Sequence, residues 1–377
     1  MEIPFAQSQR STIGIEWELA LVDADSGDLR QVAQTVLDAV APDGRDHPTI
    51  KQELLLNTVE IVTGVCRTVA EAGADLQRTQ DELRRVTDPL RVELMCAGTH
   101  PFASWSNQKV TDKERYATLI DRTQWWGRQM LIYGIHVHVG IETRAKVLPI
   151  LAAMLTYFPH LQSLSASSPF WGAKDTGYAS NRALMFQQLP TAGLPFAFTQ
   201  WSELEAYTSD MMHTGVIDQF DEIRWDLRPS PRLGTLEMRI CDGASNLTEV
   251  LALAAFTQCL VEHFSTLHDA GEPLPRLQPW FVQENKWRSA RYGMDAIIIT
   301  DADGDEEPVS DAVERALEDL APTAERLGCP TELADVRTIL RKGAGYQRQR
   351  AVARRHGGEL GPVVDALVAE MRAGRPL

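Results

Sequence analysis

Residues 11–22 read STIGIEWELALV, and this stretch decides the fold that we predict. Apolar and polar side chains alternate along it, as they do in a β-strand whose successive side chains point to opposite faces. Five apolar side chains would share one face, while Glu16 and Glu18 would share the other. Two interpretations fit this pattern: a half-buried strand with its glutamates in water, or one wall of a site that uses two carboxylates. Only the rest of the chain can distinguish them.

The composition predicts a soluble, cytoplasmic enzyme. The 377 residues are 44% hydrophobic and 24% charged, which is enough for a large core. A net charge of −15 argues against nucleic acid or an anionic membrane as a partner, because both are bound by clustered Lys and Arg. The five cysteines are odd in number and lack CxxC spacing, as expected for reduced thiols. The sequence shows neither a signal peptide nor an apolar run of about 18 residues.

The hydrophobic pattern predicts short strands mixed with helices. Further strands are expected at 51–64, 92–98, 131–141, 223–229 and 234–242, and helices at 32–40, 67–87, 111–130, 146–165, 203–212 and 247–267. Residues 167–188 form a long loop, which is usually functional in a compact domain. Trp125 and Trp126 are expected in core or subunit-interface packing rather than in a ligand platform. We predict one catalytic domain over 1–377, with the sheet and active site in 10–300 and a helical portion packed on it in 308–377.

Other predicted strands also carry polar groups among apolar residues. Glu53 and Glu60 are seven residues apart, so one unbroken strand would place them on opposite faces. A break near Asn57 would free their directions. On the later strands the polar pairs that face away from the apolar residues are His136 with His138 and Glu237 with Arg239.

Together these strands supply many carboxylates and two imidazoles. Such a ligand set favours Mg²⁺ or Mn²⁺ over zinc or copper. Carboxylates that face one cavity repel one another unless cations lie between them, which indicates a site for more than one metal ion. Mg²⁺ held in this way completes its shell with phosphate oxygens, so a nucleotide is the expected substrate. Arg239 could then reach a transferring phosphoryl group, or it could merely pair with Glu237.

Several motifs also resemble one known family. They are 14–18 (GIEWE), 52–54 (QEL) with Glu60, 134–140 (GIHVHVG), 179–182 (ASNR), 226–229 (DLRP), 235–239 (TLEMR) and 284–288 (ENKWR). Over most of the chain the sequence resembles the YbdK-type carboxylate–amine ligases of the bacterial glutamate–cysteine ligase type 2 family. The resemblance implies an α+β fold like the catalytic domain of glutamine synthetase. In that fold a curved, mainly antiparallel sheet holds the metals on its concave face and helices pack on its convex side.

The same resemblance assigns roles to individual residues. Metal-ligand positions are matched by Glu16, Glu18, Glu53, Glu60, His136 and Glu237. Positions near the nucleotide phosphates are matched by His138 and Arg239. Lys286 and Arg288 are further candidates for nucleotide contacts, although Arg288, like Arg228 and Arg291, could instead clamp an amino-acid carboxylate or only touch the acidic surface. Arg239 and Arg182 are the expected catalytic residues, and the segment 167–188 around Arg182 is the expected water-excluding lid.

The implied reaction is an ATP-dependent ligation. ATP, with Mg²⁺ or Mn²⁺, phosphorylates a substrate carboxylate, and an amine attacks the acyl phosphate to form an amide, γ-glutamyl if the acid is glutamate. The implied partners are amino-acid-like carboxylate and amine substrates, and a homodimer is left open. Two alternatives also stay open: a guanidino kinase-like phosphotransferase, and a catalytically weak metal- or nucleotide-binding protein.

Overall fold

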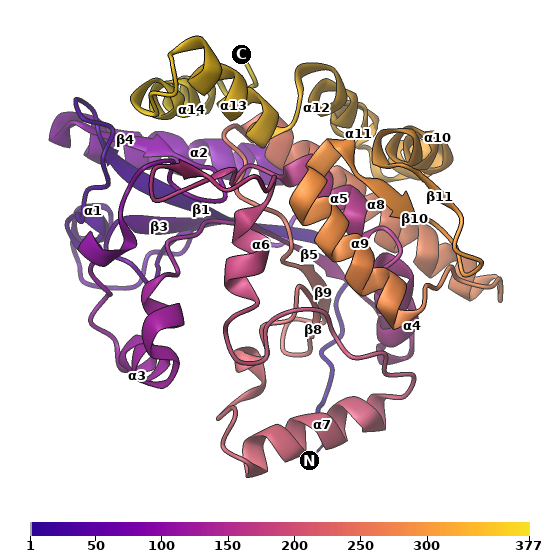
Figure 1. Ribbon diagram of the computed structural model, residues 1–377. Helices are drawn as coiled ribbons and strands as arrows, with labels where there is room; N and C mark the ends of the chain where they lie inside the picture. The colour runs from indigo at the N-terminus through magenta and orange to yellow at the C-terminus, as the bar shows by residue number, and fades with distance from the viewer. Residues whose placement is uncertain (1) are drawn as a thin grey trace.

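A seven-stranded antiparallel sheet forms the centre of the computed structural model, which describes residues 2–377 (Figure 1). The strand order is β2-β3-β1-β5-β9-β8, and β4 pairs with the second half of β1. The strands are β1 (Ile13–Asp23), β2 (Ile50–Gln52), β3 (Thr58–Val62), β4 (Val92–Met95), β5 (Ile135–Gly140), β8 (Leu227–Ser230) and β9 (Thr235–Met238). The sheet confirms the α+β class with mainly antiparallel pairing.

Strand β1 is the axis of this sheet, since it pairs with β3, β4 and β5. Its alternating pattern behaves as expected. The apolar side chains, each at most 1% exposed, are Ile13, Ile15, Trp17, Leu19 and Leu21. Glu16 and Glu18 lie on the other face and are partly exposed. Of the two possibilities left open for 51–64, the structure has the break near Asn57, because β2 and β3 are separate strands on either side of that residue.

Helices cover the apolar face of the sheet. α2 (Val69–Thr87) packs on β1 and β3, and α8 (Leu247–Asp269) packs on β5 and on α2 (Figure 1). Both helices begin at a side-chain cap, Thr68 for α2 and Asn246 for α8, whose oxygen accepts a hydrogen bond from a first-turn N–H. By length and composition alone α8 could cross a membrane, but 72% of its most apolar window is buried inside the protein.

The C-terminal helices belong to the same core. They are α10 (Val309–Leu327), α11 (Pro330–Ala334), α12 (Val336–Lys342), α13 (Gly345–Arg355) and α14 (Gly361–Ala373). One cluster of buried apolar residues runs from Ile13 to Met371. Arg348 on α13 also pairs with Glu249 of α8 at 2.7 Å and with Glu370 of α14 at 2.9 Å. The C-terminal portion is therefore helical and packs on the sheet-bearing part.

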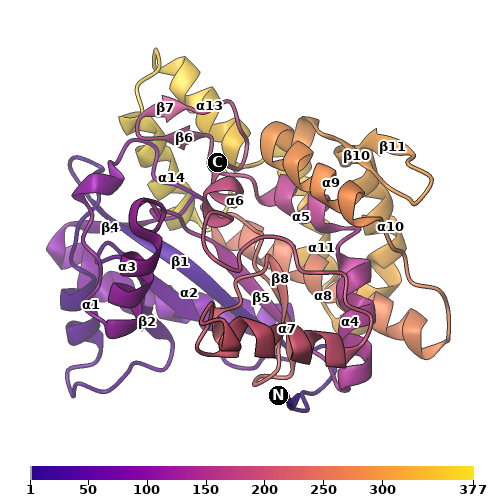
Figure 2. The same cartoon turned by 60° about the horizontal axis from the view of Figure 1, so that its bottom comes forward.

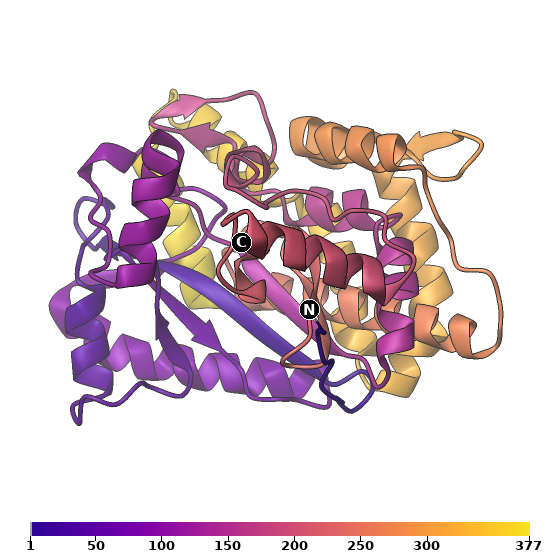
Figure 3. The same ribbon diagram turned by 90° about the horizontal axis from the view of Figure 1, so that it is seen from below.

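The other face of the sheet is more open. Figure 3 views this face, where α3 (Glu114–Arg128), α6 (Asn181–Phe186) and α7 (Trp201–His213) lie around β1 and β5. The remaining helices and strands are α1 (Ala33–Val40), α9 (Pro279–Tyr292), β10 (Ile297–Ile299) and β11 (Glu306–Pro308). The polar side chains of the strands therefore face a space that helices border but do not fill.

Two predicted helices differ from expectation. Residues 146–165 form α4 (Arg144–Met154) and α5 (Phe158–Ser165), which are bent by 64° relative to each other. Pro159 in the first turn of α5 favours a new helix start there. In α3 the helical path is broken at Gln124, whose φ is 47°. Trp125 and Trp126 follow the break and are 59% and 42% exposed, so the prediction of core packing is wrong and an interface role stays a prediction.

The segment 167–188 is not the irregular loop that the sequence predicts. It contains a small hairpin, β6 (Phe170–Trp171) with β7 (Lys174–Asp175), and then α6. Figure 2 shows the hairpin beside α13, where Arg350 pairs with Asp175 at 2.6 Å. Three serines of the segment, Ser167, Ser168 and Ser180, are bound to Asp242, more than 60 residues away in the sequence, and a hydropathy pattern does not register such contacts.

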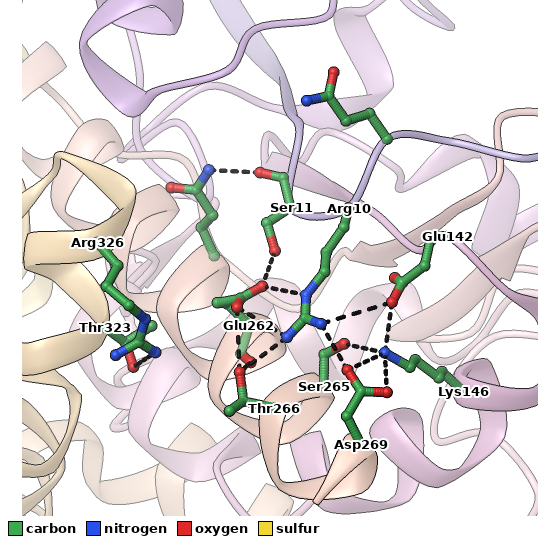
Figure 4. A network of polar contacts seen from close by, with 12 residues as sticks. Arg10, Ser11, Glu142, Lys146, Glu262, Ser265, Thr266, Asp269, Thr323 and Arg326 are labelled. Atoms are coloured by element: carbon green, nitrogen blue, oxygen red, sulfur yellow. Dashed lines mark hydrogen bonds and ion pairs between the residues drawn. The ribbon is translucent and has the colours of Figure 1, made fainter.

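Ion pairs fix the entry into β1. Arg10 contacts Glu262 of α8 at 2.8 Å, and the hydroxyl of Ser11 donates to the same carboxylate at 2.5 Å (Figure 4). The buried Lys146 of α4 contacts Asp269 of α8 at 2.6 Å in the same network. The start of β1 is therefore anchored to two helices on the apolar side of the sheet.

Candidate active site

The strand register brings the polar side chains into one row across the open face of the sheet. Directly opposed pairs are Glu18 with Glu60, Glu16 with His136, His138 with Glu237, and Arg228 with Glu237. Side chains directly opposite on neighbouring strands lie about 5 Å apart. Five strands (β1, β3, β5, β8 and β9) thus deliver seven ionisable groups that the sequence spreads over more than two hundred positions.

One group in this row consists only of carboxylates. Oxygens of Glu18, Glu53 and Glu60 lie within 4.8 Å of one another. Burial and the neighbouring charge of Glu18 raise the pKa of Glu53 to about 8. Burial and the charge of Glu53 likewise raise the pKa of Glu60 well above its usual range. Glu18 accepts a hydrogen bond from the backbone N–H of Gly134 at 2.5 Å, which fixes its direction.

A second group combines two carboxylates with histidine. Ligand atoms of Glu16, His136 and Glu237 lie within 4.8 Å of one another. Burial alone would raise the pKa of Glu16, but hydrogen bonds from His136 and His138 outweigh it and lower that pKa well below its usual range. His136 lies 2.8 Å from one Glu16 oxygen and His138 lies 3.3 Å from the other.

Arginines hold the end of this row at Glu237. Arg228 donates to one carboxylate oxygen at 2.5 Å, and Arg239 donates to the other. Burial would raise the pKa of Glu237, but the charges of Arg239 and Arg228 lower it far below its usual range. Arg239 also lies close to His136, and burial together with this cation lowers the pKa of that histidine.

The two groups differ in how well they fit a divalent cation. Glu18, Glu53 and Glu60 offer hard oxygen donors whose mutual repulsion favours protonation, so a cation between them would remove an unfavourable charge. This group fits Mg²⁺ or Mn²⁺. The second group offers two carboxylates and an imidazole, but both oxygens of Glu237 are already held by arginines. This second group can hold a cation only if Arg239 turns away from Glu237 toward another anion.

A deep cleft lies over the row and has two lobes. The lobes enclose about 650 Å³ and about 670 Å³. They share a set of lining residues at their junction: Glu18, Glu53, Arg115, His136, Asp221, Arg228 and Arg239. One lobe runs between α3 and α6 and includes Leu119, Ile132 and Phe186. The other runs toward α1 and β2 and includes the cations Arg45, Lys51 and Lys113. The carboxylate row is therefore reached from two separate compartments.

The structure brings most of the predicted site residues to this cleft. The predicted metal ligands all line it or lie in the two groups, and Arg182, His138 and Arg239 line it too. Lys286 and Arg288 do not line either lobe. Lys286 is buried against Asp226 at 2.5 Å, and Arg288 pairs with Glu284 and Glu306 on the outer side of α9. Both cations are paired with carboxylates in this structure, and their assignment to the nucleotide stays a prediction.

Several arginines of the cleft were not singled out from the sequence. Arg115 and Arg122 lie on α3, and Arg224 precedes β8. Arg115 and Arg122 are seven residues apart in a predicted helix, so a shared face could have indicated them. Nothing in the local sequence of Arg224 carries such a signal. Its cation reaches the cleft because it donates to two backbone carbonyls of the adjoining loops.

Known proteins resemble this chain in sequence. A family model described as glutamate-cysteine ligase family 2 (GCS2) matches residues 12–366. One relative, named "Putative glutamate--cysteine ligase 2-1", from Arthrobacter sp. (strain FB24), is 61% identical over 380 residues and covers 99% of each chain. Another, named "Putative glutamate--cysteine ligase 2", from Mycobacterium tuberculosis (strain ATCC 25177 / H37Ra), is 58% identical over 98% of this chain and 97% of the relative.

Solved structures share the fold at much lower identity. Glutamate–cysteine ligase from Francisella tularensis, solved in complex with AMP, has a TM-score of 0.67 at 13% identity and covers 98% of this chain and 90% of its own. A bifunctional glutathione synthetase from Pasteurella multocida has a TM-score of 0.66 at 15% identity, over 96% of this chain and 52% of its own. These likenesses confirm the glutamine synthetase-like fold class. The family model and the close relatives span nearly the whole chain, and the protein therefore belongs to glutamate–cysteine ligase family 2.

Proposed function

We propose that the protein is an ATP-dependent carboxylate–amine ligase that forms an amide through an acyl phosphate, with an amino acid such as glutamate as the acid. One observation carries the proposal: the carboxylate row and its arginines lie where two lobes of one cleft meet. A phosphoryl group must pass between ATP and a second substrate, and such a junction lets both reach the same charged centre. Family membership favours this reaction over guanidino kinase-like phosphotransfer and over binding alone.

The carboxylates of the row are the groups that would hold Mg²⁺ or Mn²⁺. Glu18, Glu53 and Glu60 form one ligand group, and Glu16, His136 and Glu237 form the other. When bound there, divalent cations offset the charge on the phosphates of ATP.

Arg239 supplies positive charge to the transferring group. Its guanidinium lines both lobes, and it binds Glu237 through Nη1 while its Nε has no partner in the described chain. A guanidinium can hold two oxygens of a phosphoryl group at once, so Arg239 stabilises charge that develops on it. Arg182 lies beside it, since its Nη1 donates to the backbone oxygen of Arg239 at 3.2 Å.

The bond changes balance in two steps. An oxygen of the substrate carboxylate attacks the terminal phosphorus of ATP, the bond to the bridging oxygen breaks, and ADP leaves. The nitrogen of the amine then attacks the acyl carbon, inorganic phosphate leaves, and the nitrogen gives up a proton. Because water would hydrolyse the acyl phosphate, the apolar wall of Leu119, Ile132 and Phe186 protects it.

The cysteines of the protein support a proposal about its cellular compartment. Its five cysteines are all unpaired and buried, which supports a reducing compartment such as the cytoplasm. Small amino-acid-like substrates are the proposed partners. A homodimer stays a prediction.

A product assay tests the proposal. Purified protein is given Mg²⁺, ATP and a panel of amino acids as acids and amines, and phosphate, ADP and product masses are followed. Amide together with phosphate supports the ligase, whereas a phosphorylated product with ADP alone would establish a kinase. Glu16→Gln should abolish nucleotide turnover while the variant still folds, as a circular-dichroism spectrum like that of the wild type would show. An active Glu16→Gln variant would contradict the proposed metal site.

A further inference from the structure

Asp242 is a buried carboxylate behind the cleft that the reaction described above does not use. It follows β9, and its side chain accepts three hydrogen bonds from one segment. Oδ2 accepts from the backbone N–H of Ser167 at 3.0 Å and from the hydroxyl of Ser168 at 2.6 Å. Oδ1 accepts from the hydroxyl of Ser180 at 2.8 Å. Burial raises the pKa of Asp242, against the charge of Arg182 and these hydrogen bonds, which lower it. The three hydrogen bonds, all made inside the protein, tie the segment to the residue that follows β9.

The two serines pass this contact on to α6. Ser168 Oγ accepts from the backbone N–H of Arg182 at 3.0 Å, and Ser180 Oγ accepts from that of Ala183 at 3.3 Å as the N-cap of the helix. A hydroxyl has one proton and two lone pairs. Each serine hydroxyl donates its hydrogen bond to Asp242. The lone pairs of the hydroxyl oxygens are therefore turned toward the backbone N–H groups in the first turn of α6.

Helix α6 carries two side chains into the cleft. Arg182 is 3% exposed, and its Nη1 donates to the backbone oxygens of Arg239 at 3.2 Å and of Ile240 at 3.4 Å. The ring of Phe186 lies beneath both arginines, with 5.7 Å from its centre to the guanidinium carbon of Arg182 and 5.9 Å to that of Arg239. The position of α6 therefore sets the position of both guanidinium groups.

Glycines make room at both ends of this chain of contacts. A Cβ on Gly98 would lie 2.6 Å from the carboxyl carbon of Asp242, and a Cβ on Gly134 would lie 2.2 Å from Nη2 of Arg182. Both distances are far inside van der Waals contact. The carboxylate and the guanidinium are thus packed directly against backbone, which leaves little freedom for α6.

We infer that Asp242 is a positioning residue that acts through Ser168 and Ser180 to hold α6, so that Arg182 faces the phosphoryl-transfer centre. It touches no substrate. The segment 167–188 is then a fixed wall of the cleft and not the mobile lid that its length suggests. The inference rests on the proposed function only for the role of Arg182.

Asp242→Asn is the first test. Asn keeps the size of the side chain and one accepting oxygen, but its NH₂ cannot accept a proton from a hydroxyl, so one serine contact is lost. We expect kcat for amide formation to fall about tenfold or more while KM for ATP stays within about threefold. Asp175→Asn is the matched control, because Asp175 lies on the same segment and pairs with Arg350 without contacting α6. It should keep the kcat of the wild type.

A double-mutant cycle with Arg182→Ala decides whether Asp242 acts through α6. If it does, adding Asp242→Asn to Arg182→Ala lowers kcat by less than about twofold, although each change alone is damaging. Losses that multiply, or a wild-type kcat in Asp242→Asn, would overturn the inference. If Asp242→Asn does not fold, Ser168→Ala and Ser180→Ala enter the same cycle. A wild type that makes no amide refutes the proposed function instead, and the cycle is then read on ATP hydrolysis.

Discussion

Replacing Glu53 by Gln should stabilise the protein at pH 8 when metal ions are absent. The side chain keeps its size and one accepting oxygen, but the negative charge beside Glu18 and Glu60 is lost. Residues that assemble a charged site often lower the stability of the fold that carries them. The group formed by Glu18, Glu53 and Glu60 is such a site, because the folded chain brings together three like charges that the unfolded chain keeps apart.

The structure gives the size of the effect. Two unit charges 4.8 Å apart, the largest separation in the group, repel by about 3 kcal/mol at an effective dielectric constant of about 20. A pKa of about 8 for Glu53 instead of about 4.3 corresponds to at most about 5 kcal/mol. Because Glu53 is only partly buried, solvent screening reduces this to about 2 kcal/mol, or a rise in melting temperature of about 3 °C.

The sign of the pH dependence follows from the raised pKa. Below about pH 4 the carboxyl is protonated in both the folded and the unfolded state, so Gln and Glu differ little. Between about pH 4 and pH 8 the folded protein retains a proton that the unfolded chain has released, so the stability of the wild type falls as pH rises. Above about pH 8 Glu53 is ionised in both states, and the stability that its retained proton gave to the wild type is lost completely. The advantage of Glu53→Gln should therefore grow between pH 5 and pH 8.

Thermal melts between pH 5 and pH 9 measure this, with either EDTA or Mg²⁺ present. Mg²⁺ should stabilise the wild type more than Glu53→Gln, because the variant has lost a ligand. Glu325→Gln is the control, since Glu325 is exposed on α10, away from the cleft. If Glu53→Gln melts at or below the temperature of the wild type at pH 8 in EDTA, the carboxylates do not repel as the geometry implies.

Three further changes address the arginines. Arg239→Lys should lower kcat about 100-fold with a smaller change in KM for ATP, because Lys lacks the planar fork that binds Glu237 and faces the phosphoryl group; kinetics within about threefold of the wild type would refute that role. Gly134→Ala should lower kcat at least about tenfold in the same assay, since its Cβ would displace the guanidinium of Arg182; an unchanged kcat would contradict the close packing. Arg288→Gln should leave KM for ATP within about twofold of the wild-type value, because Arg288 lies outside both lobes. A tenfold rise in KM would instead support the assignment of Arg288 to the nucleotide.

The strand faces could be predicted from the sequence because a period of two is a local property. In β1 the side chains from Ile13 to Glu18 alternate between buried and half-buried, as the sequence pattern predicts, whereas both faces of β5 are buried. The spacing of Glu53 and Glu60 left open whether their segment breaks, and the structure shows the break at Asn57. Which strands are neighbours is not local. The order β3-β1-β5-β9, which sets Glu18 against Glu60 and His138 against Glu237, is given by the structure alone. The family resemblance implied that these residues share one site, but not which strands are neighbours.

Charge pairing marks the limit of sequence-based prediction in the site. Lys286 and Arg288 lie in a matching motif, yet buried or facing carboxylates on other elements take up their charges. Asp226 lies 60 residues from Lys286, on the approach to β8, and Glu306 lies 18 residues from Arg288, on β11. A motif gives the identity of a cation but not the direction of its side chain. For the same reason the sequence does not predict that Arg224 lies in the cleft, because its position depends on two backbone carbonyls of the adjoining loops.

The two ligand groups are held in opposite electrostatic states, and this difference organises the site. Around Glu53 the protein leaves negative charge without a partner, so the pKa rises and a cation is favoured there. Around Glu237 it supplies two arginines, so the pKa falls and that carboxylate remains ionised with or without a metal ion. A phosphate bound between the two groups would have on one side Glu18, Glu53 and Glu60, which favour a bound cation, and on the other side Arg239. If Arg239 turned from Glu237 to that phosphate, Arg228 would still hold Glu237 and a cation bound there would replace the lost charge, which would link metal occupancy to phosphate binding.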